Sequence, residues 1–263
     1  MRKVLIYGLG NVGRNLLFYL SQNKKMEIGI ISTDEAKCNA MILDLLPFSN
    51  NIKNVSKSDL SSFETLIVTA GIKDESDRLL FIKNSKDMLD NILTDVYKRG
   101  FKGNVIIVSN PTDVLSTYAY INHHEKFKNI LSTGTLIDSL RLKMINGRDI
   151  KLYGLHGKDC VSYFEDVNVD DLNEALDIGY EIQKLGFNSS YGIVLATYNL
   201  MNYLDGNYND SFVASIYNSK YNASFSHDLV IEDDIVKSLL IDEENKNFIK
   251  LKEYINKVIK EVN

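Results

Sequence analysis

The chain has 263 residues, 44% of them hydrophobic and 25% charged, which is the composition of an ordinary soluble globular protein. At this length about three quarters of the unfolded surface can be buried, so one large domain or two lobes can fold without disulfides or metals. The net charge of −5 and the pI near 5.5 argue against nucleic acid or an anionic membrane as the main partner.

The two cysteines, Cys38 and Cys160, are too few for a disulfide framework. The sequence contains no CxxC motif and no Cys/His cluster, so we expect no metal site. It also has no signal peptide and no apolar stretch long enough to span a membrane. These features predict a protein of the reducing cytoplasm.

The first element in chain order is a short apolar run, residues 2–7, which is typical of a buried parallel strand. The motif GLGNVG follows at once and places Gly8, Gly10 and Gly13 in a G-x-G-x-x-G, ahead of leucines at helical spacing. Strand, glycine turn and helix in this order predict a dinucleotide-binding site, with the pyrophosphate at the helix N-terminus. We expect Asn11 and Val12, inside the motif, to contact the cofactor as well.

The second strand is predicted at residues 27–31, and an acidic residue at its end would bind the adenosine ribose. Ser32 and Thr33 stand there instead, with Asp34 slightly later. Asp34 is either the ribose ligand or the N-cap of the following helix. Because Asp34 and Glu35 disfavour a 2′-phosphate, the sequence favours NAD without excluding NADP.

Two further strand-like runs, residues 65–72 and 104–115, end in small or polar residues, where doubly wound sheets place their ligands. A long amphipathic helix is predicted between them at residues 78–97, and Pro111 opens another. This alternation predicts an α/β fold with an N-terminal Rossmann doubly wound parallel sheet. The expected cofactor contacts at these strand ends are Thr69, Ala70, Gly71, Ser109 and Asn110.

The segment from Asp138 to His156 contains an acid, a guanidinium and an imidazole in quick succession. Asp138 and Arg141 are three residues apart and share one face of a predicted helix. A carboxylate beside an imidazole raises its basicity and fixes its tautomer, and a guanidinium can bind a substrate carboxylate through two hydrogen bonds. An ordinary surface ion pair and a turn histidine remain the alternative interpretation.

The second half of the chain is predicted to mix helices with short strands. We expect a strand at residues 161–169, helices at 171–185 and 190–204, two or three short strands, and an amphipathic C-terminal helix. The predicted domains are a dinucleotide-binding Rossmann domain at residues 1–134 and an α+β catalytic domain at residues 135–263.

With TAGIKDESDRL, VSNPTDVL, TGTLIDSLR and GLHGKD in order behind GLGNVG, the chain resembles the lactate/malate dehydrogenase family. The resemblance implies that His156 is the acid/base, that Asp138 orients it, and that Arg141 binds the substrate carboxylate. It further implies that Arg78 polarises the substrate carbonyl from a mobile loop, that Asn110 contacts substrate and nicotinamide, and that Ser189 lies nearby.

The implied activity is that of an NAD-dependent oxidoreductase, similar to L-lactate dehydrogenase, that interconverts a 2-hydroxy acid and its 2-keto acid. Family members are commonly homodimers or homotetramers. Acids around Lys73 would repel a second carboxylate, which favours a monocarboxylate such as lactate, a bulkier 2-hydroxy acid or a positively charged substrate. An ordinary solvated loop is the equally open interpretation of these acids. The shortened loop from Gly71 to Arg78 leaves a reductase of a larger carbonyl or imine as one alternative. The missing ribose acid at Ser32 leaves a non-catalytic nucleotide-binding protein as another.

Overall fold

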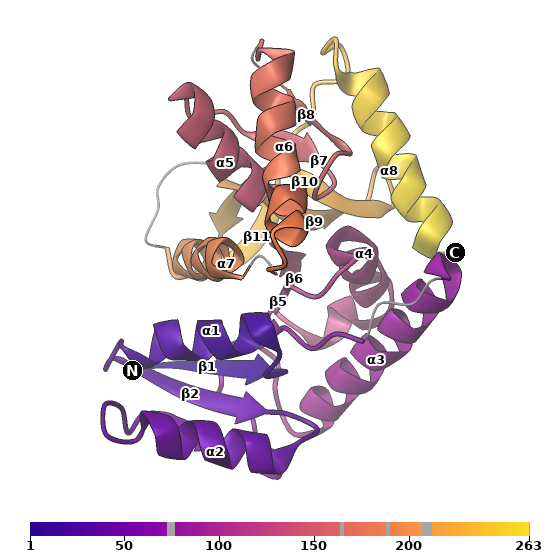
Figure 1. Ribbon diagram of the computed structural model, residues 1–263. Helices are drawn as coiled ribbons and strands as arrows, with labels where there is room; N and C mark the ends of the chain where they lie inside the picture. Colours follow the sequence, from indigo (N-terminus) through magenta and orange to yellow (C-terminus); the bar gives the residue numbers. More distant parts are fainter. Residues whose placement is uncertain (73–76, 164–165, 188–189, 207–211, 263) are drawn as a thin grey trace. The chain divides into compact units, whose positions relative to one another are not determined.

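The computed structural model describes residues 1–263 except 73–76, 164–165, 188–189, 207–211 and 263 (Figure 1). The chain divides into two compact units. The first unit contains Met1–Pro111 and Tyr118–Ile130, and the second contains Thr112–Thr117 and Leu131–Asn263. The division passes through helix α4 (Thr112–His123), and the domain boundary expected after residue 134 remains a prediction.

The first unit contains a parallel sheet with strand order β3-β2-β1-β4-β5. Its strands are rich in Val, Ile and Leu, and Val4, Leu5 and Ile6 of β1 are completely buried, as strands covered on both faces require. The expected Rossmann sheet is therefore confirmed. The strands are β1 (Arg2–Tyr7), β2 (Met26–Ile31), β3 (Ile52–Asn54), β4 (Thr65–Val68) and β5 (Asn104–Ile107).

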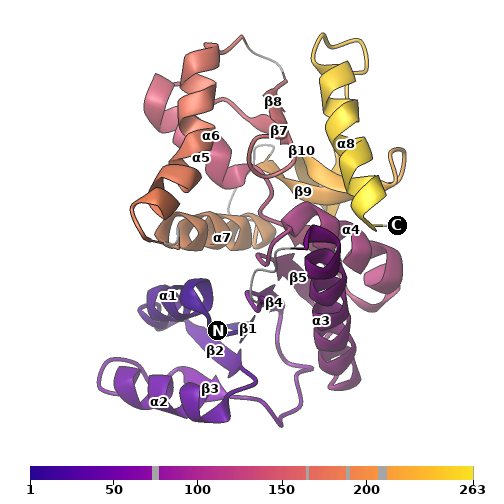
Figure 2. The same cartoon turned by 45° about the vertical axis from the view of Figure 1, so that its right-hand side comes forward.

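Helices connect these strands, as Figure 2 shows from a second direction. In α1, Leu16, Leu17 and Leu20 recur at helical spacing and are buried where the helix packs against β1 and β2. The α2 helix packs against β2 and β3. The helices are α1 (Asn11–Ser21), α2 (Glu35–Leu45) and α3 (Arg78–Lys98), with the end of α4 and the short 3-10 turn η1 (His124–Lys126).

The second unit is built on an antiparallel sheet with strand order β6-β9-β10-β7-β8, and β11 pairs with β10. Figure 1 shows its helices around these strands. The strands are β6 (Asn129–Ser132), β7 (Leu152–Gly154), β8 (Cys160–Ser162), β9 (Phe212–Asn218), β10 (Ala223–Glu232) and β11 (Ile235–Ser238). The helices are α5 (Leu136–Asn146), α6 (Val169–Lys184), α7 (Tyr191–Leu204) and α8 (Phe248–Val262).

The expected strand at residues 161–169 is wrong for most of its length. Strand β8 ends at Ser162, and Asn168 already caps α6 by accepting a hydrogen bond from the Asp170 N–H at 2.8 Å. Asn in front of two acidic residues is a helix-start signal, and it outweighs the short alternation of apolar residues before it. Strands β3 and β6 had not been expected, because each is only three or four residues long.

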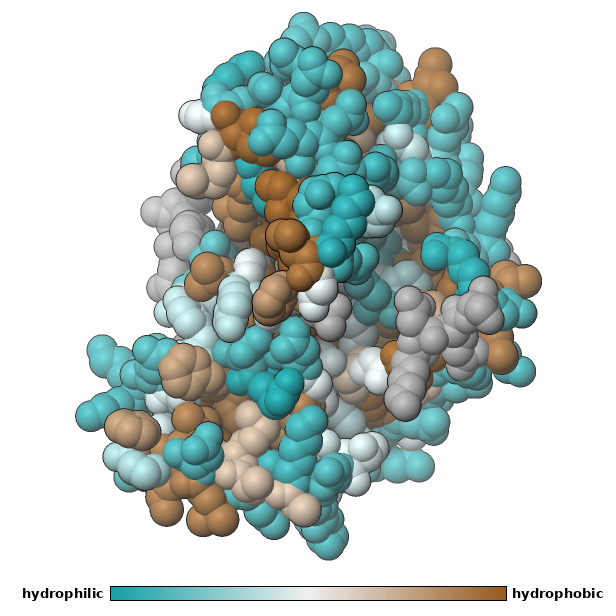
Figure 3. Space-filling model, in the orientation of Figure 1, coloured by the Kyte–Doolittle hydropathy of each residue, from teal (hydrophilic) through white to brown (hydrophobic). Residues whose placement is uncertain are grey.

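The visible surface is mostly hydrophilic, with apolar side chains at intervals (Figure 3). Some of these lie over α2, where Leu43 and Leu46 are exposed. In the part of the chain that the structure describes, none of the helices is both long enough and apolar enough to cross a membrane.

Candidate functional site

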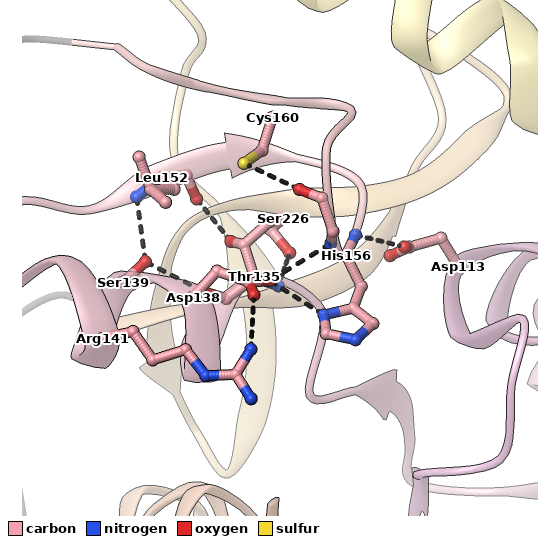
Figure 4. A network of polar contacts seen from close by, with 10 residues as sticks. Asp113, Thr135, Asp138, Ser139, Arg141, Leu152, His156, Cys160 and Ser226 are labelled. Carbon is pink, nitrogen blue, oxygen red and sulfur yellow. Dashed lines mark hydrogen bonds and ion pairs between the residues drawn. The ribbon is translucent and has the colours of Figure 1, made fainter. Parts of the chain in front are cut away.

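The second unit brings the acid, the guanidinium and the imidazole together, as the sequence predicts. Asp138 and Arg141 lie on α5, and His156 lies in the turn between β7 and β8. The His156 Nδ1 atom is 2.8 Å from Asp138 Oδ2, and Arg141 Nη1 is 3.4 Å from Asp138 Oδ1. In Figure 4 the imidazole and the guanidinium extend to the same side of Asp138. One carboxylate therefore orients both groups.

A tight turn holds His156 in place. Gly154 adopts a φ of +118°, and a Cβ there would come within 2.6 Å of the Asp159 carbonyl oxygen, so only glycine fits without strain. The turn is closed by a hydrogen bond from the Leu155 N–H to the same oxygen at 2.8 Å. The backbone geometry thus fixes the direction in which the imidazole leaves the chain.

Asp138 is the most deeply buried member of the group, with 1% of its side chain exposed, against 12% for Arg141 and 34% for His156. Its Oδ2 also accepts the Gly157 N–H at 3.3 Å. A buried carboxylate is tolerated only when it is paired and hydrogen-bonded, and Asp138 satisfies this requirement through three residues. The imidazole is the most accessible of the three side chains, and the guanidinium is accessible in part.

The pKa of His156 is raised above its ordinary value of 6.5. Burial acts most strongly on it and lowers the pKa, but the hydrogen bond that the ring donates to Asp138 and the charges of Asp138 and Asp113 together outweigh burial and the opposing charge of Arg141. The imidazole consequently holds its proton to a higher pH than an isolated histidine. This is the behaviour of a general acid and base that works near neutral pH.

Asp113, on the first turn of α4, is a further carboxylate of this network that the sequence had not singled out. Its Oδ2 accepts the backbone N–H of His156 at 2.9 Å (Figure 4). The side chain is 5% exposed, and burial raises its pKa although Ser215 and His156 oppose this. Asp113 therefore anchors the backbone of the turn, while Asp138 orients the ring.

Neutral hydrogen bonds attach α5 to the strands around it. Ser226 Oγ accepts the Thr135 N–H at 2.8 Å, and Ser139 Oγ accepts the Leu152 N–H at 3.0 Å. The Thr135 hydroxyl donates to the Leu152 carbonyl oxygen (Figure 4). Because all of these atoms are buried, each bond satisfies polar groups that would destabilise the fold if they had no partner. They hold the helix that carries Asp138 and Arg141.

Cys160 lies near the network but does not have the properties of a nucleophile. Its thiol donates to the Gly157 carbonyl oxygen at 3.3 Å, and burial followed by the charge of Asp138 raises its pKa well above 9. A catalytic cysteine requires a lowered pKa. Among the described residues no group of three or more His, Cys, Asp or Glu side chains could hold a metal ion.

The first unit contains a cavity of about 590 Å³ beside the glycine turn. The turn contributes Gly8 and Gly10, and the ends of the neighbouring strands contribute the rest of one wall. Helix α1 starts directly after Gly10, which has no side chain with which to cap it. A cavity at a helix N-terminus and at the carboxyl ends of parallel strands fits a dinucleotide. Its lining comprises Tyr7, Gly8, Leu9, Gly10, Ser32, Thr33, Lys37, Thr69, Ala70, Gly71, Met88, Asn91, Ile92 and Asp95.

The three glycines of the turn differ in what a side chain would meet. A Cβ on Gly13 would lie 2.0 Å from the Gly8 carbonyl oxygen and 2.6 Å from Thr69 Oγ1, whose hydroxyl donates to that same oxygen at 2.7 Å. A Cβ on Gly10 would meet no described atom within 4 Å. Gly13 is thus required for packing, whereas the space at Gly10 is open to a ligand.

We expect Gly13→Ala to lower the free energy of unfolding by about 1–3 kcal/mol, because the backbone of the turn must shift. Gly10→Ala should change it by less than about 0.5 kcal/mol. Urea unfolding of the two variants measures this difference. Equal stabilities would contradict the packing role of Gly13.

The structure also locates the other expected site residues. Asn11 and Val12 open α1, and Asn110 is exposed ahead of α4. The Ser109 hydroxyl donates to the Val68 carbonyl oxygen at 3.2 Å and to that of Ala70. Ser189 falls outside the described residues.

Arg78 and Asp34 occupy helix starts. Arg78 is the first residue of α3, whose N-cap Asp77 accepts the Leu79 N–H at 2.9 Å. Asp77 is therefore used as a cap, and the remaining loop acids, Asp74 and Glu75, fall outside the described residues. Asp34 caps α2, so of the two interpretations of this residue the structure supports the cap.

Comparison with known proteins agrees with this geometry. Residues 2–131 match the family model of the lactate/malate dehydrogenase NAD-binding domain. The NAD-binding unit of the chain, over residues 2–131, belongs to the lactate/malate dehydrogenase family. The description of the matched domain supports NAD as the cofactor of the first unit.

Two relatives of the chain are named L-lactate dehydrogenases. L-lactate dehydrogenase 2 of Clostridium acetobutylicum is 26% identical over 208 residues, which are 69% of this chain and 65% of that protein. L-lactate dehydrogenase of Mycoplasma mobile is 29% identical over 188 residues, 64% of this chain and 59% of that protein. The chain thus spans 59–65% of the length of these two relatives.

Two solved structures of lactate dehydrogenases share the fold of the whole chain. A lactate dehydrogenase from a Medee basin deep-sea metagenome library matches with a TM-score of 0.86 at 20% identity, over 100% of this chain and 98% of that one. The minor L-lactate dehydrogenase of Enterococcus mundtii also gives 0.86, at 19% identity and with the same coverage. The expected fold class, a Rossmann unit followed by an α+β unit, is confirmed.

Proposed function

We propose that this protein is an NAD-dependent 2-hydroxy-acid dehydrogenase of the L-lactate type, which interconverts a 2-hydroxy acid and its 2-keto acid. The observation that carries the proposal is the shared carboxylate of Asp138, with His156 Nδ1 at 2.8 Å and Arg141 Nη1 at 3.4 Å. An acid/base group and a carboxylate-binding group oriented by the same residue suit a substrate whose hydroxyl and carboxylate are on adjacent carbons.

In this proposal Arg141 binds the substrate carboxylate. Its planar guanidinium can donate two parallel hydrogen bonds to the two oxygens, which fixes the orientation of the substrate as well as its charge. Asp138 restrains the guanidinium from one side, and Gly179 of α6 lies close to it, since a Cβ there would be 3.5 Å from Nη1. Helix α6 therefore passes within van der Waals distance of the guanidinium at this position.

His156 transfers the proton. In the oxidation its neutral imidazole removes the proton of the substrate hydroxyl through Nε2, because Nδ1 is engaged by Asp138. Asp138 stabilises the imidazolium that results, and in the reduction this imidazolium returns the proton to the carbonyl oxygen. NAD, when bound, supplies the hydride acceptor of the oxidation and its reduced form supplies the donor of the reverse reaction.

The remaining expected roles are part of the same proposal. Arg78 would polarise the substrate carbonyl, Asn110 and Ser189 would contact the substrate, and the glycine turn would hold the pyrophosphate. Assembly into a homodimer or homotetramer also stays a prediction.

The pH dependence tests the assignment of His156. Because its pKa is raised, kcat/KM for reduction of pyruvate should fall as the pH rises through a value above 6.5, and oxidation of lactate should rise over the same interval. Asp138→Asn removes the hydrogen-bonded charge that raises the pKa, so the reduction profile should move to lower pH. Steady-state rates across the pH range measure both effects.

Asp159→Asn is the matched control. Asp159 lies in the same turn, but its carboxylate pairs with Lys257, at 2.6 Å, and not with His156. We expect this variant to keep the profile of the parent protein. A profile that is unchanged in Asp138→Asn would mean that another group transfers the proton.

A further inference from the structure

The adenosine end of the cavity has an unusual charge for a site that binds NAD. The segment after β2 lines it with Ser32, Thr33 and Lys37, two hydroxyls and an ammonium group. At this point NAD-binding sheets place an acidic residue that hydrogen-bonds the ribose 2′-OH, and a basic residue instead accommodates a 2′-phosphate. The described lining of this segment contains one basic residue, Lys37, and two hydroxyls, and it contains no acidic residue.

The two acids of the segment have other partners. Asp34 Oδ1 accepts the Lys37 N–H at 3.1 Å as the cap of α2, and Asp34 does not line the cavity. The carboxylate of Glu35 pairs with Lys57 at 3.1 Å. A capping bond and an ion pair both favour the observed orientations of these carboxylates. The two acids that would disfavour a 2′-phosphate on sequence grounds therefore act as a helix cap and as the partner of Lys57.

The charged groups around Lys37 do not neutralise its ammonium group, so it can bind an anion. Within the described residues its ammonium group is not within 4.0 Å of a carboxylate. Asp95 is the acidic residue of the described lining, and it is paired at 3.0 Å with Arg99, the C-cap residue of α3. The charge of Asp95 is thus balanced locally, and Lys37 contributes a positive charge to the wall.

We propose that Ser32, Thr33 and Lys37 form a subsite for the 2′-phosphate of NADP(H), so that the protein binds NADPH at least as tightly as NADH. Lysine serves as a point charge for phosphate, and the two hydroxyls can donate to its oxygens. The proposal rests on the proposed function in that it requires a nicotinamide dinucleotide in this cavity.

Calorimetric titration of the full chain with NADPH and with NADH tests the proposal. We expect the Kd of NADPH to be no larger than that of NADH. In Lys37→Ala the Kd of NADPH should rise at least about fivefold more than that of NADH, because one charge-assisted hydrogen bond is lost. Lys57→Ala, which removes a lysine that pairs with Glu35 outside the cavity lining, should change neither.

A second variant introduces the acid that is missing. Ser32→Asp should raise the Kd of NADPH by about tenfold or more, while the Kd of NADH should stay the same or fall. The subsite alone would be overturned if the parent protein bound NADH more tightly than NADPH. It would also be overturned if Lys37→Ala raised the Kd of both nucleotides by the same factor. Failure to bind either nucleotide would instead overturn the proposed function.

Discussion

His156→Asn should lower kcat/KM for the reduction of pyruvate by about 10²- to 10⁴-fold, which is the usual contribution of a positioned general acid. Asparagine can still donate a hydrogen bond toward Asp138, which is 2.8 Å from the ring in the native protein, so the buried carboxylate keeps a partner. The fold should therefore survive while the titrating group is lost. Initial rates with saturating reduced cofactor measure the loss.

The controls separate chemistry from folding and from cofactor binding. His124→Asn removes a histidine whose ring stacks on Tyr120 at 4.8 Å, outside the proposed site, and should keep full activity. The Kd of NADH for His156→Asn should stay within about twofold of the parent value, because the cavity is lined by other residues. Full activity of His156→Asn would remove this residue from the mechanism.

Arg141→Lys should raise the KM for pyruvate by about 10- to 100-fold. The variant keeps a positive charge but loses the second parallel hydrogen bond, and a hydrogen bond to a charged group contributes about 1.5–3 kcal/mol. The lysine ammonium can still approach Asp138, so the buried carboxylate is not left without a cation. Steady-state kinetics, together with titration of the unreactive analogue oxamate, measure the change.

Two comparisons make this result specific. Arg148→Lys changes an exposed arginine whose Nη1 donates to the Asp166 carbonyl oxygen at 3.2 Å, and it should leave KM unchanged. The KM for pyruvamide, which lacks the carboxylate, should differ little between Arg141→Lys and the parent protein. If Arg141→Lys weakened pyruvate and pyruvamide equally, its effect would arise from distortion of α5 and not from a lost carboxylate contact.

Local patterns in the sequence predicted much of this structure. The glycine motif between an apolar strand and a leucine-rich helix predicted the Rossmann turn, because each of its requirements is met within about a dozen residues. The spacing of Asp138 and Arg141 predicted a shared helix face for the same reason. Their pairing with His156 required a contact across 18 residues, and here the ordered family motifs supplied what periodicity could not.

The features that were missed depend on three-dimensional contacts. Asp113 reaches the backbone of His156 across 43 residues, and only its place in VSNPTDVL hinted at a role. Lys37 lines the cavity from the first turn of α2, and Asp34, which the sequence left ambiguous, is the cap of that helix. The strand expected at residues 161–169 failed because a short alternation of apolar residues is a weaker signal than a helix cap.

The central claim is that the protein transfers hydride between a nicotinamide cofactor and the carbon that bears the substrate hydroxyl, with His156 moving the proton. The most direct test is reduction of pyruvate by the full chain with cofactor carrying deuterium at the reactive carbon of its reduced nicotinamide. The account predicts lactate with deuterium on its hydroxyl-bearing carbon, formed by the parent protein and far more slowly by His156→Asn. Bound cofactor with no deuterated product from pyruvate or from other 2-keto acids would contradict it.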